Sequence, residues 1–221
     1  MILRRIKVNA GAIMGINCYV IQDEKTKETM IIDPGNLSEA LANILDAMQI
    51  NLKYILLTHC HADHMAGVKA VKEKYGGKLL VYTKETEGIR DYNINLSSHI
   101  GLGEIILEED SRLNDGDLIH IGELEFQIIH TPGHTGGSIS VYCKEENLIF
   151  TGDTLFRGSW GRTDLPTSSF EDIIESITNK LMILPEDTIV YPGHGKSTII
   201  KEEKPIYLEM RKKDWEWSSP K

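Results

Sequence analysis

The sequence predicts a domain of the α/β or α+β class, in which sheets and helices pack in layers. Short apolar segments of strand length alternate with longer segments whose apolar residues recur at helical spacing. No repeat of fixed period occurs, and no Pro-, Ser- or Gly-rich linker divides the chain. A length of 221 residues, of which 41% are hydrophobic, suits one domain with a sizeable core. We therefore expect a single domain over residues 1–221.

The first half of the chain predicts four strands and two helices. Residues 16–22 and 29–33 form a strand pair around the charged loop EKTKE. Asn36 and Glu39 have the spacing of a capping box, and a helix with one apolar stripe follows over residues 37–48. Strands over residues 53–58 and 79–82 flank a second helix over residues 62–75, which Gly76 and Gly77 end.

The second half begins irregularly and then returns to short strands. Residues 84–116 predict a short helix and a long loop, and residues 117–130 predict two strands that turn at Gly122. Two more strands are expected over residues 138–143 and 148–150, joined by a polar turn. A helix over residues 170–181, a strand over 188–191 and a last helix over 199–213 complete the prediction.

Charge and cysteine content exclude several classes of protein. The chain has 33 acidic and 24 basic residues and a net charge of −9, which argues against a nucleic-acid partner. No apolar stretch is long enough to span a bilayer, and the N-terminus lacks the pattern of a signal peptide. The three cysteines are far apart and form no CxxC motif, which is typical of a reducing compartment. We expect a cytoplasmic protein without a membrane partner.

Side chains that ligate metals follow four of the predicted strands. The segment THCHADHMAG at residues 58–67 places His59, His61, Asp63 and His64 directly after a strand. The segments HTPGHTGGS, FTGDTLF and YPGHGKS each follow another strand, and they contain His134, Asp153 and His194. If these strands run in the same direction, the four loops meet at one edge of the sheet, where functional residues concentrate.

Five histidines and two aspartates suit two metal ions rather than one. In an extended segment His59 and His61 point the same way, whereas Asp63 and His64 face another direction as a helix begins. We expect His59, His61 and His134 to bind one ion, Asp63, His64 and His194 the other, and Asp153 to bridge them. Imidazole and carboxylate ligands without a thiolate favour Zn²⁺, with Fe or Mn²⁺ as alternatives. Such a pair lowers the pKa of a shared water to about 7 and creates a hydrolytic nucleophile.

The other histidines and the nearby cysteine favour structural roles. His120 and His130 lie in predicted strands, and His99 lies in a loop. Cys60 points away from its two histidine neighbours in an extended segment, so a packed thiol is expected.

The motifs HCHADH, HTPGHTGGS, GDTLF and PGHG together resemble those of the metallo-β-lactamase-fold hydrolases. They run from Thr58 to His194, and with their flanking strands they cover nearly the whole chain. The resemblance implies a four-layer αββα sandwich with the metals at one edge of the paired sheets, and the same two ligand sets. The β-lactamases themselves usually have Cys where this chain has Asp153, so antibiotic hydrolysis is not expected.

Within this superfamily, GDTLFRGSWGRTDLP is similar to the glyoxalase II branch, the hydroxyacylglutathione hydrolases. These cleave S-2-hydroxyacylglutathione to glutathione and a 2-hydroxy acid, which implies a small acyl thioester as substrate. Arg162 takes the place of a Lys that holds a glutathione carboxylate in that family. Asp164 replaces a Tyr. Either its negative charge repels an anionic peptide such as glutathione, or its carboxylate forms an ion pair with Arg162 or Arg157. Only residues 195–221 follow His194, which resembles the shorter, single-domain group.

The resemblance implies an enzyme, a dinuclear thioesterase in which a metal-bridged hydroxide attacks the carbonyl carbon. Asp63 would also be catalytic, because it accepts a hydrogen bond from the hydroxide and directs it. THCHADH and GRTD also resemble persulfide dioxygenases, which bind one iron through two His and one Asp, here His59, His134 and Asp153. A lactonase or other ester hydrolase of the same fold, and a metal-binding module without activity, are further alternatives.

Overall fold

Two six-stranded sheets form the centre of the molecule. The computed structural model describes residues 1–217, with side chains through Glu209. The first sheet has the order β1-β2-β3-β4-β5-β6, made of β1 (Ile2–Ala10), β2 (Ile13–Gln22), β3 (Glu28–Ile32), β4 (Asn51–Leu56), β5 (Lys78–Tyr82) and β6 (Ser111–Leu113). The second has the order β14-β13-β10-β9-β8-β7, made of β7 (Leu118–Ile121), β8 (Leu124–His130), β9 (Ile139–Cys143), β10 (Leu148–Gly152), β13 (Ile189–Pro192) and β14 (Thr198–Ile199). A small ribbon pairs β11 (Leu155–Phe156) with β12 (Ser159–Trp160).

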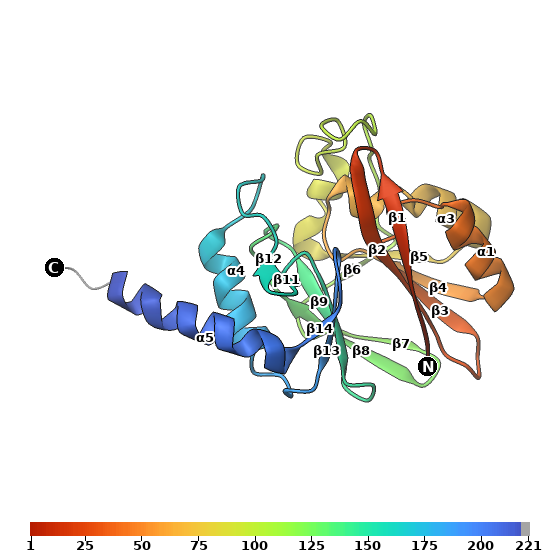
Figure 1. Cartoon of the computed structure of the whole chain (residues 1–221). Coiled ribbons are helices and arrows are strands. Elements are labelled where there is room, and N and C mark those ends of the chain that lie inside the picture. The colour runs from red at the N-terminus through yellow and green to blue at the C-terminus, as the bar shows by residue number, and fades with distance from the viewer. Residues whose placement is uncertain (218–221) are drawn as a thin grey trace.

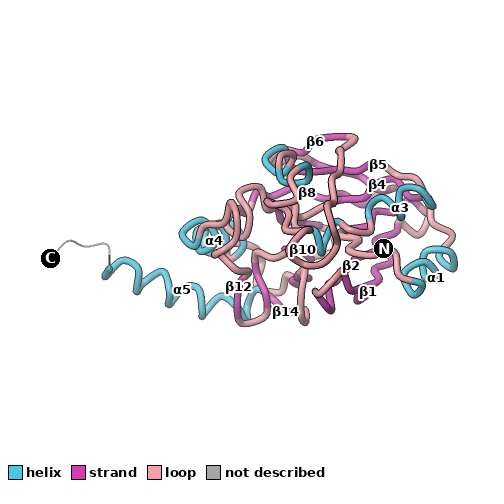
Figure 2. The backbone as a smooth tube through the Cα atoms, turned by 90° about the horizontal axis from the view of Figure 1, so that it is seen from above, coloured by secondary structure: helices cyan, strands magenta, loops and turns pink. Residues whose placement is uncertain are grey.

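Helices cover the outer face of each sheet. On the first sheet lie α1 (Glu39–Met48), α2 (Ala62–Met65) and α3 (Val68–Tyr75), and on the second lie α4 (Phe170–Ser176), the π-helical turn η3 (Ile177–Leu181) and α5 (Ile200–Trp217) (Figure 1). Two 3₁₀ turns, η1 (Thr83–Glu85) and η2 (Gly88–Arg90), follow β5. The far half of α5 extends away from the body in both views (Figures 1 and 2). The predicted four-layer αββα sandwich is confirmed. Within residues 1–217, no helix combines the length and the apolar character needed to cross a bilayer.

Alternate residues of the central strands pack into different layers. In β2, Tyr19 belongs to the core between the sheets, whereas Val20 belongs to the cluster beneath α1 and α3. In β10, Phe150 packs between the sheets and Ile149 packs with residues of α4 and η3. Because both faces of these strands are buried, their sequences are nearly continuous apolar runs.

The direction of the strands brings the polar loops to one edge. Strands β3 to β6 are parallel, and β8, β10 and β13 run in one direction within the second sheet. Hydrogen bonds join the two sheets there. The Asn17 side-chain amide (2.9 Å) and the Tyr19 hydroxyl (2.6 Å) both donate to the Pro192 carbonyl, and the Ile139 amide donates to the Thr58 carbonyl at 2.9 Å. The strand ends of both sheets therefore share one surface.

Several local predictions are wrong in informative ways. The helix expected over residues 62–75 is divided into α2 and α3, because Gly67 packs against the turn that follows β3. The cap of α1 is Ser38, whose hydroxyl accepts a hydrogen bond from the Leu41 amide, while Asn36 donates instead to the Asn9 carbonyl. Strands β1, β6, β11, β12 and β14 were not predicted, and all five are paired with neighbouring strands.

Gly67 generates a test of the packing that positions α2. A Cβ atom there would lie 2.3 Å from the Pro34 carbonyl oxygen, so Gly67→Ala forces two backbone segments apart. We expect the free energy of unfolding to fall by about 1–3 kcal/mol in urea titration. Gly136→Ala is the matched control, since its nearest atoms would lie at 3.6 and 3.8 Å. Equal stability of the two variants would contradict this account.

Candidate metal centre

The structure brings all seven residues expected to ligate metal to the shared edge of the two sheets. Their side chains come from the loop after β4, from α2, and from the loops after β8, β10 and β13: His59, His61, Asp63, His64, His134, Asp153 and His194. His59, His61, His64, His134 and Asp153 are buried, and Asp63 and His194 are partly buried. Residues separated by 135 positions in the chain therefore form one cluster.

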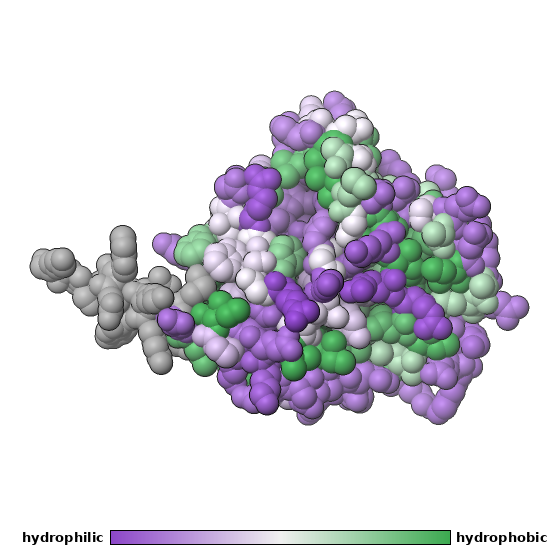
Figure 3. All heavy atoms as spheres, in the orientation of Figure 1, coloured by the Kyte–Doolittle hydropathy of each residue, from purple (hydrophilic) through white to green (hydrophobic). Residues whose placement is uncertain are grey.

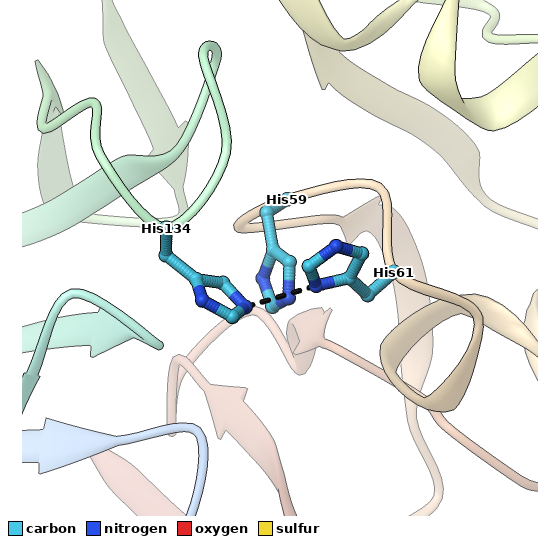
Figure 4. A group of neighbouring side chains, drawn as sticks. All are labelled: His59, His61 and His134. Carbon is cyan, nitrogen blue, oxygen red and sulfur yellow. Dashed lines mark hydrogen bonds between the residues drawn. The ribbon is translucent and has the colours of Figure 1, made fainter. Parts of the chain in front are cut away.

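His59, His61 and His134 form the first of the two expected sets (Figure 4). One nitrogen from each lies within 4.8 Å of those of the other two, and His61 Nδ1 lies 2.9 Å from His134 Nε2. The buried Nε2 atoms of His59 and His61 have no hydrogen-bond partner among the described residues. Buried polar atoms are costly to leave unpaired, so this donor set fits a metal ion.

The tautomers of the histidines agree with that fit. The Thr58 hydroxyl donates its proton to Asp33, so its oxygen accepts from Nδ1 of His59 at 3.1 Å and leaves Nε2 with a lone pair. Nδ1 of His134 likewise donates to the Arg162 carbonyl at 2.9 Å, which leaves its Nε2 directed at His61. A histidine that ligates a metal usually donates its other ring N–H to an acceptor in the protein, and this hydrogen bond fixes its tautomer.

Asp63, His64 and His194 form the second set, and Asp153 lies between the two. His64 Nε2 lies 3.2 Å from His194 Nε2, which lies 3.3 Å from Asp63 Oδ2. Asp153 Oδ2 lies 3.6 Å from both His134 Nε2 and His194 Nε2, while its Oδ1 lies 3.5 Å from His64 Nε2. This carboxylate faces members of both sets, as expected of a bridging ligand.

Asp33 is a site residue that the sequence predicted only as the end of the strand over residues 29–33. One of its oxygens lies with nitrogens of His59 and His64 in a third group of ligand type. Its carboxylate already accepts hydrogen bonds from the Thr58 amide (2.8 Å), the Thr58 hydroxyl (2.6 Å) and Nδ1 of His64 (3.0 Å). Asp33 therefore orients these residues rather than completing a metal site. One signal in the sequence could have identified Asp33 as a site residue. It directly follows β3, which lies beside β4 in the parallel part of the sheet.

Glu85 was also missed, and it connects the loops that carry the first set. The Cys60 amide, between His59 and His61, donates to Oε2 of this buried carboxylate at 2.6 Å. The Thr135 hydroxyl, next to His134, donates to Oε1 at 2.8 Å. Nothing in the irregular sequence around Glu85 indicates these partners. The Cys60 thiol is free and packed, as expected, and burial raises its pKa well above the usual value.

Arg162 and Asp164 form an exposed ion pair at the rim of the site. The guanidinium donates two hydrogen bonds of 2.9 Å to the carboxylate, so one of the two predicted pairings is confirmed. Arg157 lies 3.7 Å from Glu202 instead. Both members of the pair are 69% exposed in their side chains, so solvent weakens the attraction. The three histidines set aside, His99, His120 and His130, belong to neither ligand set among the described residues.

The charges within the cluster differ between the two sets. Burial lowers the pKa of His59 and His61 well below the usual value, and the neighbouring imidazoles add to the effect. Burial also opposes a charge on His64, but Asp63, Asp153 and Asp33 outweigh it and raise its pKa to about 10. Although burial opposes it, His64 and His194 lower the pKa of Asp63. At neutral pH His59 and His61 are therefore uncharged, whereas His64 is an imidazolium close to the Asp63 carboxylate.

A cavity of about 290 Å³ opens over the cluster. Its polar floor comes from His61, Asp63, His134, Asp153 and His194, and Arg162 lies on its wall. The rest of the wall is apolar and comes from Ile13, Leu96, Ile100, Phe156 and Leu165. Ligand-type side chains under an apolar cavity form a site suited to a small molecule.

Known proteins are similar to this chain in sequence and in fold. The sequence pattern of the Metallo-beta-lactamase superfamily matches residues 12–194. The chain is 35% identical to hydroxyacylglutathione hydrolase GloC of Haemophilus influenzae, over 85% of this chain and 89% of that protein. It is similar to the crystal structure of BLEG-1 B3 metallo-beta-lactamase, with a TM-score of 0.84 and 38% identity over 92% of this chain and 97% of that one. It is also similar to TTHA1623 in a di-iron-bound form, with a TM-score of 0.78 and 29% identity over 90% and 96% of the two chains.

The pKa of His64 predicts that metal binding to the second set releases a proton. Below about pH 10 the metal-free His64 keeps both ring protons, so a cation must displace the one on Nε2. His59 and His61 are already neutral at pH 7 and have no proton to lose. We expect calorimetric titration of metal-free protein in two buffers to show one more proton released for the ion that binds His64 than for the other ion. The affinity for the proton-releasing ion should fall about tenfold per pH unit from pH 9 to pH 7.

His64→Asn provides the control for this titration, because it removes the proton and one ligand of the second set only. The ion held by the first set should still bind, and the proton released from His64 should no longer be detected. Binding of both ions to the unaltered protein without any released proton would contradict the assignment.

Proposed function

The chain belongs to the metallo-beta-lactamase superfamily and is a metallo-hydrolase, and on that premise we propose that it hydrolyses an acyl thioester of the glyoxalase II type. The products would be a thiol, with glutathione as the expected one, and a 2-hydroxy acid. The observation that carries the proposal is Asp153, whose carboxylate faces both ligand sets beneath a cavity open to a small molecule. The relative named hydroxyacylglutathione hydrolase supports the choice of substrate.

The residues of this site suit hydrolysis of a thioester. Two divalent ions there, Zn²⁺ or alternatively Fe or Mn²⁺, would supply a water of lowered pKa and polarise the carbonyl oxygen. Asp63 accepts a hydrogen bond from the attacking water and directs it at the carbonyl carbon. Asp33 holds His64 in place, and the Arg162 carbonyl holds His134. The thiolate leaves without a strong general acid, because thiols are far more acidic than alcohols.

The cysteines and the net charge of the chain support the same proposal. Cys18, Cys60 and Cys143 are free thiols, which agrees with the reducing cytoplasm where glutathione thioesters would occur. We propose a small-molecule substrate, with neither nucleic acid nor a membrane as partner, in keeping with the net charge of −9.

A single-iron enzyme of the persulfide dioxygenase type is the competing proposal. It would use His59, His134 and Asp153 and would give no role to the second set. The close approach of Asp63, His64 and His194 favours two ions and therefore the hydrolase.

Kinetics on S-D-lactoylglutathione, run together with metal analysis, test the proposal. We expect hydrolysis with two bound ions per chain. Asp153→Ala should lose metal and at least about a hundredfold in kcat/KM, because even residues that only support a ligand cost 10–100-fold. Asp187→Ala removes an exposed carboxylate and should leave both readouts unchanged.

Competing activities are measured on the same preparation. One bound iron with oxygen uptake on glutathione persulfide would replace the proposal with the dioxygenase. Hydrolysis of a cephalosporin in preference to every thioester and ester would replace it with the activity named for BLEG-1. Bound metal without turnover of any of these substrates would leave only the metal-binding module.

The exposed pair predicts how glutathione is recognised. If Arg162 holds a glutathione carboxylate, Asp164 competes for the guanidinium and repels the substrate. Asp164→Asn should then lower KM for S-D-lactoylglutathione severalfold with kcat unchanged, and Arg162→Ala should raise KM. A thioester of a neutral thiol serves as control, and its KM should not respond to either change. Identical KM values in all three proteins would rule out this role of Arg162.

A further inference from the structure

Four apolar side chains line the cavity without contributing to the core. Leu96, Ile100, Phe156 and Leu165 are half-buried around the cavity. Among the described residues, none of the four belongs to the three buried clusters or to the partly buried side chains packed against them. Their apolar surface therefore borders the space above the metal ligands. Such surface is best covered by an apolar part of a ligand.

Leu96 lies on this wall in an unfavourable backbone conformation. Its φ is +65°, in the left-handed region that a branched side chain such as Leu rarely adopts and that Gly and Asn adopt readily. Strain of this kind persists where the surroundings hold a residue in place, and it concentrates at functional sites.

The neighbours of Leu96 are what hold it. Asn95 and Ser97 are fully buried on either side. The Asn95 carbonyl accepts from the Ala62 amide at 2.8 Å, next to the candidate ligand His61, and its side-chain amide donates to the Ile105 carbonyl at 2.9 Å. The Ser97 hydroxyl accepts from the Ile105 amide at 3.0 Å. The loop is thus fixed to the start of α2, and Leu96 has a defined position beside the ligands.

A second contact fixes the other side of the wall. The Ala12 amide, in the β1–β2 hairpin, donates to the Ile100 carbonyl at 2.9 Å. Gly11 of the same turn approaches this carbonyl so closely that a Cβ atom would lie 2.1 Å from the oxygen. Apolar side chains gather at the top of Figure 3, where Figure 1 shows the hairpin and the loop after η2. The apolar wall is therefore built from segments fixed to one another.

We propose that Leu96, with Ile100, selects substrates whose acyl group carries an apolar chain. This inference rests on the proposed thioester hydrolysis and narrows its substrate class. With the thioester carbonyl over the metal ligands, the acyl chain extends along Leu96 and the thiol extends towards the rim, where Arg162 and Asp164 lie. The preferred 2-hydroxyacyl group would then be larger and more apolar than lactoyl.

The test is a chain-length series of acyl thioesters of N-acetylcysteamine, a small neutral thiol that keeps recognition of the leaving group constant. Full burial of one methylene changes binding about fourfold, so two methylenes should raise kcat/KM about fifteenfold from acetyl to butanoyl. Leu96→Asn keeps a side chain of similar length that is at ease in the left-handed region. It should reduce the ratio of the butanoyl kcat/KM to the acetyl kcat/KM to below about threefold.

Thermal unfolding separates selection from a structural role. Leu96→Asn should unfold at the same or a higher temperature, since the strained conformation suits Asn, whereas loss of a core leucine would lower Tm. Leu96→Gly is a second variant with the same expectations. Ile106→Asn, at an exposed position of the same loop, is the control and should keep the full chain-length dependence.

The outcomes distinguish this inference from the proposed function. Turnover of all the thioesters with no dependence on chain length would overturn the inference and leave thioester hydrolysis standing. Full chain-length dependence in both Leu96 variants would also overturn it. Hydrolysis of neither S-D-lactoylglutathione nor any thioester of the series would overturn the proposed function itself.

Discussion

The buried carboxylate of Asp33 is the interaction on which the rest of the site depends. It directly follows β3. It accepts three hydrogen bonds, two from Thr58 just after β4 and one from His64 in α2. Through Thr58 it also determines which nitrogen of His59 carries the proton. One carboxylate thus orients a ligand of each set, His59 and His64. Such control suits metal binding, because a ligand must offer a lone pair in a fixed direction.

The architecture explains why this edge holds charge that the interior does not tolerate. The middle of the sandwich is an apolar core between the sheets, and the candidate ligands lie beyond it, where strands of both sheets end. Among the described residues, the imidazoles of His59 and His61 are buried here with an unpaired Nε2 atom each, which is unfavourable without a cation. Metal binding would relieve that cost, so metal affinity and folding stability are coupled in this protein.

Chemistry and selectivity reside in different parts of the molecule. The candidate ligands follow strands of the two sheets, where position is set by the ladders and by the hydrogen bonds that join the sheets. The apolar wall instead comes from the β1–β2 hairpin and from loops such as that of residues 91–110. Loops on a rigid scaffold can change without disturbing the ligands. A shared metal centre can therefore serve relatives with different substrates.

The sequence by itself determined the layered fold, most of the strands and the seven candidate ligands. These depend on local signals, namely apolar runs, helical spacing, and ligand side chains directly after strands. The roles of Asp33 and Glu85 depended on the tertiary structure, because their partners lie 25 to 50 positions away. The position of Asp33 after a strand is a signal but does not identify those partners, and Glu85 has no local signal. The division of the helix at Gly67 and the placing of Leu96 were likewise decided by contacts with distant backbone. The spacing of apolar residues predicts which face of a helix or strand is buried. The residues that this face contacts are determined only when the sheets pack together.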